Sequence, residues 1–213
     1  FEAIAVAQAA MVARIPIAHI HGGEITAGLI DEAIRHSLTK MSHLHFVATD
    51  VYKNRIIQLG ENPSNIFNFG APGLDNIKKL TLLKRDEISE AIGFKLDKKY
   101  LMVTHHPVTL SSSSAALGLS NLLSILDEYP EYQLIISYPN ADTNYKELID
   151  ILNQYYLKNK SRTFLSRSLG QLNYLSCLKH CELVVGNSSS GLIEAPTLGV
   201  PTVNIGDRQQ GRI

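Results

Sequence analysis

Short apolar runs alternate with longer amphipathic stretches along the chain, and this alternation predicts strands and helices in turn. In the first part of the chain, apolar runs predict strands at 15–19, 44–48 and 66–69. Apolar residues that recur every three or four positions predict helices at 1–14, 27–41 and 51–59. Helices and strands therefore take turns here.

The same alternation restarts after a composition break at 70–73, which reads Gly-Ala-Pro-Gly. Strands are predicted at 100–104, 134–137, 163–165, 184–185 and 202–205, and helices at 74–82, 85–92, 117–129, 145–157 and 169–179. Strands that alternate with helices of this length imply parallel sheets with right-handed crossovers. We therefore predict an α/β fold with two Rossmann-like parallel-sheet domains that face a cleft. Residues 1–73 would form the C-terminal part of the first domain, and 74–213 most of the second.

Composition and charge narrow the class of protein. The 213 residues carry 20 Lys and Arg against 20 Asp and Glu, so there is no basic footprint and we expect no nucleic-acid partner. No apolar run approaches the roughly 18 residues that would span a membrane, so we expect no membrane partner. Cys177 and Cys181 have helical spacing and no second pair of ligands, which favours packing residues over a zinc site. Reduced buried cysteines suit the cytoplasm, where we expect the protein to act.

The stretch 184–212, VVGNSSSGLIEAPTLGVPTVNIGDRQQGR, has the pattern of a nucleotide-diphosphate cradle. Serines and a glycine lie where a helix begins after a strand, and free backbone N–H groups at a helix start suit a phosphate. A carboxylate follows about one turn later, where it can accept hydrogen bonds from a sugar diol. Ordinary N-caps and surface charges would give the same local pattern. The candidate residues are Ser188, Ser189, Ser190, Gly191, Glu194 and Arg208.

Two further sets of polar residues follow the predicted first strand. In AHIHGGE, His21 and Glu24 flank two glycines that let the backbone approach a ligand closely. A metal site of two histidines and a glutamate, or a turn with His19 buried and His21 solvated, fits this pattern as well. Asp31 and Arg35 lie four apart on the next helix, which is the spacing of a surface ion pair.

Two polar motifs also follow strands of the second half. In HHPVT, Pro107 keeps His106 extended and directs a side chain away from the strand end. A histidine there can serve as a general acid or as a phosphate donor, because its pKa ordinarily lies near neutrality. Asn140 belongs to PNAD after the next strand, which equally fits a simple Asn/Asp turn.

The motifs GNSSSGLIEAPTLGVPTVNIGDRQQGR, IDEAIRHSLTKMSHLHF and HIHGGE together resemble the hydrolysing UDP-N-acetylglucosamine 2-epimerases, which make free N-acetylmannosamine for sialic acid and related nonulosonic acids. The resemblance covers nearly the whole chain. It implies a GT-B-like fold, a UDP-sugar substrate and a homodimer. In related epimerases without hydrolysis the place of His21 is usually a carboxylate, so a histidine there fits the hydrolysing branch.

The resemblance also implies roles for single residues. The serines would hold the diphosphate, Glu194 the uridine ribose, and Arg208 would assist. Asp31 would act as acid or base, with Arg35 as its orienting partner or a substrate contact. His106, in preference to His105, would serve the leaving group, Asn140 would lie near the nucleotide, and the loop with His21 and Glu24 would line the sugar pocket.

The reaction of that family gives these groups a purpose, because the proton at C2 of the sugar is not acidic enough for direct inversion. The family first expels UDP from C1 with loss of the C2 proton, which gives 2-acetamidoglucal. Water then adds at C1 while a proton returns to C2 from the other face. Neither step requires a metal or a nicotinamide, so we expect no cofactor.

Other functions stay open at this point. The rivals within enzymes are a hydrolysing 2-epimerase of a UDP-2,4-diacetamido-sugar, a non-hydrolysing epimerase and a two-domain glycosyltransferase. A UDP-sugar sensor is the non-enzymatic alternative. The chain opens inside a predicted helix at Phe1 and stops at Ile213 just after the basic loop, which predicts a fragment lacking both termini. We therefore expect these 213 residues alone to be inactive.

Overall fold

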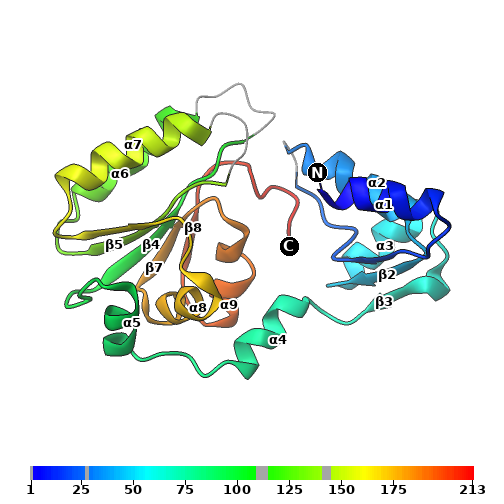
Figure 1. The fold of residues 1–213 in the computed structure, drawn as a ribbon, viewed down its shortest axis with the longest axis horizontal. Helices are drawn as coiled ribbons and strands as arrows, with labels where there is room; N and C mark the ends of the chain where they lie inside the picture. The colour runs from blue at the N-terminus through cyan, green and yellow to red at the C-terminus, as the bar shows by residue number, and fades with distance from the viewer. Residues whose placement is uncertain (1, 27–28, 109–114, 141–144) are drawn as a thin grey trace. The chain divides into compact units, whose positions relative to one another are not determined.

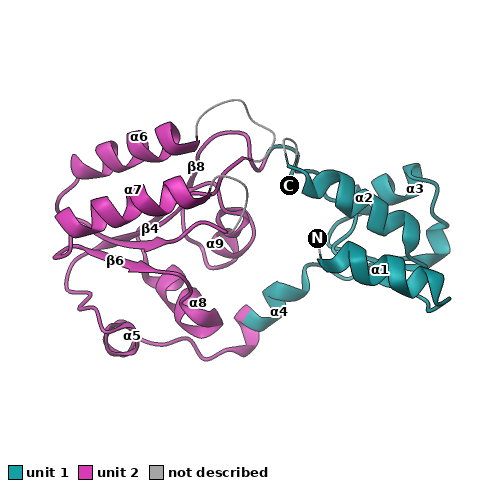
Figure 2. Cartoon of the chain, turned by 45° about the horizontal axis from the view of Figure 1, so that its top comes forward, with its two compact units in different colours: residues 1–76, 210–213 teal, residues 77–209 magenta. Residues whose placement is uncertain are grey.

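A computed structural model describes residues 2–26, 29–108, 115–140 and 145–213. The chain divides into two compact units, residues 1–76 with 210–213 and residues 77–209 (Figure 2). Both the boundary predicted at 73/74 and this division fall within the helix α4 (Pro72–Lys79). No helix of the described ranges is long and apolar enough to cross a membrane.

Unit 1 contains a parallel three-stranded sheet in the order β1–β2–β3. The strands are β1 (Ala18–Ile20), β2 (Leu44–Val47) and β3 (Ile66–Asn68), and the other elements are α1 (Glu2–Val12), α2 (Asp31–Met41), α3 (Asp50–Gln58) and the one-turn 3-10 helix η1 (Pro63–Asn65). Val47 and Ile66 pack against Tyr52 and Ile56 of α3, and all four side chains are buried. This small core fixes α3 on one face of the sheet.

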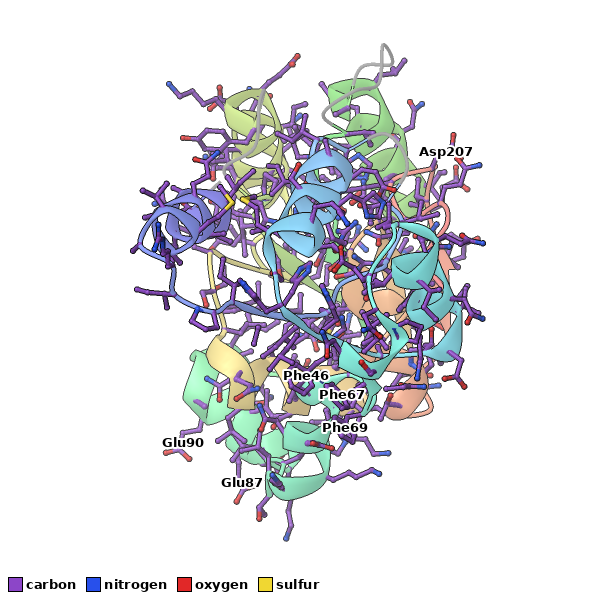
Figure 3. The ribbon with its side chains drawn as sticks, turned by 90° about the vertical axis from the view of Figure 1, so that its right-hand side faces the viewer. Phe46, Phe67, Phe69, Glu87, Glu90 and Asp207 are labelled. Atoms are coloured by element: carbon purple, nitrogen blue, oxygen red, sulfur yellow. The ribbon has the colours of Figure 1, made fainter. Side chains whose placement is uncertain are left out.

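The opposite face of that sheet is aromatic, since side chains alternate along a strand and Val47 points toward α3. Phe46 and Phe67 are paired neighbours whose rings stack with centroids 5.5 Å apart. Phe69 continues the stack at 6.0 Å from Phe67, and its side chain is 77% exposed (Figure 3).

The helix predicted over 27–41 begins later than expected, at Asp31. Residues 27–28 lie outside the described ranges, and Leu29 and Ile30 form a turn in which the Leu29 N–H donates to the carbonyl of Thr26. The Glu32 carboxylate accepts from the Thr26 N–H at 2.7 Å. This contact joins the first turn of α2 to the loop that carries Glu24 and Thr26.

Unit 2 contains a parallel five-stranded sheet in the order β6–β5–β4–β7–β8. The strands are β4 (Tyr100–Thr104), β5 (Gln133–Ser137), β6 (Thr163–Ser166), β7 (Leu183–Gly186) and β8 (Thr202–Asn204). The helices α6 (Ala115–Asp127) and α7 (Tyr145–Lys158) lie on one side of the sheet, and α5 (Arg85–Ile92) and α8 (Gly170–His180) on the other (Figure 1). The prediction of an α/β fold with two Rossmann-like parallel sheets is confirmed.

The central strands β4, β5 and β7 are buried on both faces, which explains why they are mostly continuous apolar runs rather than alternating ones. On one side, Leu101 and Val103 of β4 pack with Leu134 and Ile136 of β5 and with the apolar faces of α6 and α7. The strand order reverses beside β4, whose neighbours are β5 and β7. In open parallel sheets, ligands bind at such a reversal, beyond the carboxyl ends of the strands.

The predicted helix after the serines is broken into two short pieces. Ser189–Gly191 form the single 3-10 turn η2, and α9 (Glu194–Thr197) has only four residues. Pro196 explains the break, because it has no N–H to donate to a carbonyl four residues earlier and its ring would clash with that carbonyl. The prediction of one helix from Ser188 onward was wrong, and with it the argument from the partial charge of a helix start loses most of its force.

Candidate active site

Asn187 joins the loops that follow β4 and β7 in unit 2. Its side-chain Oδ1 accepts from the His106 N–H at 2.7 Å, and its Nδ2 donates to the His106 carbonyl at 2.8 Å. Both residues are buried. The amide side chain therefore matches the backbone of His106 as a second strand would, and it fixes the histidine at the reversal of strand order.

The ring of His106 is held as a neutral hydrogen-bond donor. The backbone N–H of Asn140 donates to His106 Nδ1 at 3.1 Å, so Nδ1 carries a lone pair and the ring proton lies on Nε2. Burial, and then the nearby charges of Arg208 and His105, lower the pKa of His106 to about 3. Of the two roles considered for this residue, the geometry favours donation to an oxygen anion over general acid catalysis at neutral pH.

The loop after β8 is tied to the same point of the unit. The Asn187 carbonyl accepts from Arg208 Nη1 at 3.1 Å and from Gln209 Nε2 at 2.7 Å. Gln209 is buried, and Arg208 is half-buried. A guanidinium, a neutral imidazole donor and the serine turn thus belong to strand ends that are neighbours in the sheet.

One serine of the serine turn is buried and bonded to another side chain, and the other two are half-buried. Ser190 is buried, and its Oγ lies 2.6 Å from the hydroxyl of Tyr174 on α8. Ser188 caps the turn by accepting the Ser190 N–H, and Ser188 and Ser189 are both half-buried. The structure therefore gives Ser190 a packing role and leaves the other two hydroxyls nearer the surface.

Glu194 carries an unsatisfied acceptor. Its Oε2 is buried and has no hydrogen-bond partner within the described ranges. Burial raises the pKa of the adjacent Tyr174 to about 12, with Glu194 adding to the shift and the bond to Ser190 opposing it. A buried carboxylate oxygen without a donor calls for one from a ligand, such as a hydroxyl.

A second polar cluster lies in unit 1, directly after β1. Glu24 is 5% exposed, its Oε1 lies 2.9 Å from His21 Nδ1, and its Oε2 lies 2.9 Å from Arg212 Nη2. Burial alone would raise the pKa of this carboxyl, but the hydrogen bond from His21 and the charges of Arg212, His21 and Arg35 outweigh it and hold the pKa below its usual value. An ionised carboxylate only accepts hydrogen bonds, so the proton between the two residues is on His21 Nδ1 and the Nε2 lone pair is available.

The HGGE loop reaches this geometry through an unusual backbone. His21 has φ +65° and Gly23 has φ +79°. A side-chain carbon on Gly23 would lie 2.5 Å from the carbonyl oxygen of Tyr52, so only glycine fits there. His19 points elsewhere and lies 3.2 Å from Thr39 Oγ1, while burial, followed by the charge of His45, lowers its pKa to about 4. Within the described ranges, no group of three or more His, Cys, Asp or Glu side chains could hold a metal ion.

Arg35 does not pair with Asp31 as its spacing predicted. Its Nη1 donates to Thr26 Oγ1 at 3.0 Å, to the Glu24 carbonyl at 3.3 Å and to Glu32 Oε2 at 3.3 Å. Asp31 is exposed at the first position of α2. The idea that Arg35 orients Asp31 is therefore wrong for this geometry, and Arg35 instead braces the loop that carries Glu24.

Sequence reasoning missed several residues of these clusters. Asn187 stood inside the quoted cradle motif without a role of its own, and Tyr174 stood within the helix predicted at 169–179. Glu32 and Arg212 stood inside the quoted motifs without a role. A polar residue directly after a buried strand was the one signal that could have identified Asn187, whereas the contacts of Tyr174 and Arg212 depend on chain segments far apart in the sequence.

Comparisons with known proteins identify a family for this chain. The sequence model of the family described as UDP-N-acetylglucosamine 2-epimerase matches residues 1–213. The chain is 41% identical over its full length to the GDP/UDP-N,N'-diacetylbacillosamine 2-epimerase (hydrolyzing) of Campylobacter jejuni, and 43% identical to the polysialic acid biosynthesis protein P7 of Escherichia coli. It spans 56% and 54% of these two relatives, about half of their length.

A solved structure shares the fold. The UDP-GlcNAc 2-epimerase of Neisseria meningitidis bound to UDP-GlcNAc superposes with a TM-score of 0.76 at 20% sequence identity. The match covers 97% of this chain and 57% of that one.

Proposed function

Because the chain belongs to the UDP-N-acetylglucosamine 2-epimerase family, we propose that the intact protein is a hydrolysing UDP-N-acetylglucosamine 2-epimerase. It would convert UDP-N-acetylglucosamine and water into N-acetylmannosamine and UDP. The observation that carries this proposal is the His21–Glu24 pair, in which an ionised carboxylate leaves imidazole Nε2 as a base. Relatives whose names include the word hydrolyzing, at 41% and 36% identity, support the same branch.

The first step is loss of UDP from C1 of the sugar. The C1–O bond breaks with its electron pair moving to the diphosphate, and the developing charge needs fixed donors. Unit 2 offers His106 Nε2–H and the Arg208 guanidinium, with the hydroxyls of Ser188 and Ser189 beside the strand end. The unsatisfied Glu194 oxygen would accept from the ribose hydroxyls and so orient the nucleotide.

In the same step a base removes the proton from C2, and the electron pair of that C–H bond forms the C1=C2 double bond of 2-acetamidoglucal. His21 Nε2 suits this task, because the Glu24 carboxylate stabilises the imidazolium that results. Water then adds at C1, and a proton returns to C2 from the opposite face. Asp31, exposed at the start of α2, is the candidate for this second proton transfer, with Arg35 holding the neighbouring loop.

A second substrate has direct support from the comparisons. Two relatives, from Campylobacter jejuni and Legionella pneumophila, bear the name of N,N'-diacetylbacillosamine 2-epimerases (hydrolyzing). That sugar carries a second acetamido group at C4, and its epimerisation at C2 would use the same elimination and hydration. UDP-N,N'-diacetylbacillosamine is therefore the alternative substrate that we propose.

A proton and phosphorus NMR time course in D2O tests the proposal with the full-length protein. Incubation with UDP-N-acetylglucosamine is expected to release UDP and N-acetylmannosamine that carries deuterium at C2. A UDP-linked mannosamine would instead establish a non-hydrolysing epimerase. Turnover of the diacetamido substrate alone would establish the second candidate, and UDP binding without turnover of either sugar would establish a sensor.

The assembly and location of the protein are further parts of the proposal. We infer a homodimer from family membership, and light scattering coupled to size exclusion measures it. Two buried free thiols, Cys177 and Cys181, support a reducing compartment such as the cytoplasm. Cell fractionation with an antibody against the protein tests that location.

A further inference from the structure

Arg212 forms a nearly buried ion pair with Glu24 of the HGGE loop, the loop that carries His21 and Glu24. Its Nη2 lies 2.9 Å from Glu24 Oε2, and the side chains of Arg212 and Glu24 are only 11% and 7% exposed. His21 lies on the other carboxylate oxygen, at 2.9 Å. Each oxygen of Glu24 therefore has its own charged or polar partner, and the two partners do not compete for one site.

The backbone around Arg212 is fixed as firmly as its side chain. Gly211 has φ +87°, and a side-chain carbon on it would lie 2.5 Å from Cγ2 of Ile25, next to Glu24. The hydroxyl of Tyr52 lies 3.2 Å from the Ile213 nitrogen and 3.3 Å from its carbonyl oxygen. Gly211, Arg212 and Ile213 thus each contact the rest of unit 1. The Arg212 guanidinium therefore extends to Glu24 from a backbone that is packed on both sides of it.

We propose that Arg212 is a positioning residue, which occupies Glu24 Oε2 so that Oε1 orients His21 with Nε2 as the proton-transferring atom. This inference rests on the proposed function and deepens it. An ionised carboxylate that accepts from one imidazole nitrogen sets both the tautomer and the ring orientation, as in other carboxylate–histidine pairs. Arg212 would act through Glu24 and would not itself touch the substrate.

Loss of Arg212 has a definite geometric consequence. The charged and titratable groups that face Glu24 are His21, Arg35 and Arg212, and His21 also faces His19. Without Arg212, Glu24 Oε2 loses its ion-pair partner, and both carboxylate oxygens become available to His21 Nδ1. The imidazole ring is then no longer held in a single orientation.

The test uses R212Q and R212K in the full-length protein, with R162Q as a matched control. Arg162 is 12% exposed and also contacts a carboxylate, that of Asp127, through Nη2 at 2.9 Å, but it lies in unit 2. The position of the His21 ring proton is measured from the 15N chemical shifts of Nδ1 and Nε2. We expect R212Q to lose the single Nδ1–H tautomer and to lower kcat about 10- to 100-fold, as loss of such an orienting partner does. R212K should restore most of both, and R162Q should change neither.

An unchanged position of the His21 ring proton in R212Q would overturn the inference. If the intact protein has no epimerase activity, the proposed function fails, but the 15N shifts still decide what Arg212 does. If R212Q does not fold, the E24Q/R212Q double variant leaves no lone buried charge and is compared with E24Q. Equal kcat values are expected there, and a further loss below E24Q would show that Arg212 does not act through Glu24.

Discussion

Replacement of Asn187 by alanine is the most direct test of the arrangement in unit 2. The side chain is 1% exposed and makes two hydrogen bonds to the backbone of His106, at 2.7 and 2.8 Å. Alanine would leave a buried N–H and a buried carbonyl without partners, and each such group costs about 1–3 kcal/mol. The expected loss in the free energy of unfolding of unit 2 is therefore about 2–6 kcal/mol.

Two measurements on the full-length protein check this value. Denaturant unfolding gives the loss in the free energy of unfolding. Amide hydrogen exchange gives the free energy of opening at the His106 N–H, which should fall by at least the same amount. Asn204 is the control, because it is exposed and its Nδ2 makes one bond, to the Gly206 carbonyl. N204A should stay within about 0.5 kcal/mol of the wild type. A loss in N187A no larger than that of N204A would refute the reasoning.

The remaining predictions concern pH, thiol chemistry and the nucleotide. His106 and His19 have pKa values lowered to about 3 and about 4. Below pH ~6.5 the unfolded state therefore binds more protons than the folded state, and stability should fall as the pH drops from there toward 4. Denaturant midpoints that do not change with pH in that window would contradict this. Burial raises the pKa of Cys177 and of Cys181 to about 12, so neither thiol should react with a thiol reagent in the native protein at pH 8 within minutes, while both react in denaturant. Glu194→Gln should weaken UDP binding about 10- to 100-fold in calorimetry, because a charged acceptor for a hydroxyl is worth about 1.5–3 kcal/mol, whereas E182Q on the surface should leave it unchanged.

The central strands of unit 2 could be predicted from the sequence because burial on both faces leaves a clear apolar run, as in Tyr100–Thr104 and Gln133–Ser137. The broken helix after Ser188 was predictable in principle, since Pro196 forbids a continuous one. Local pattern therefore determined which elements exist better than it determined how far each one extends.

The candidate site was predictable in its residues more than in its contacts. His21, Glu24 and His106 follow strands, which sequence pattern can detect. Spacing on a helix suggested Asp31 as the partner of Arg35, but Arg35 contacts Glu32 on the same helix and the loop before α2 instead. Likewise, the low pKa of His106 arises from burial between loops, and no local pattern reports burial of that kind.

The assignment of residues 210–213 to unit 1 has a consequence for biosynthesis. During translation, the loop with His21 and Glu24 leaves the ribosome early, but Arg212 emerges only after the whole of unit 2 has been made. Domains generally fold in order as they emerge, at about 5–20 residues per second. Unit 1 must therefore wait several seconds or more with its buried carboxylate facing fewer cations than in the finished fold. Completion of the loop with His21 and Glu24 is therefore among the last events in the synthesis of this segment. Nascent chains stalled before and after residue 212 should differ in the protease resistance of unit 1.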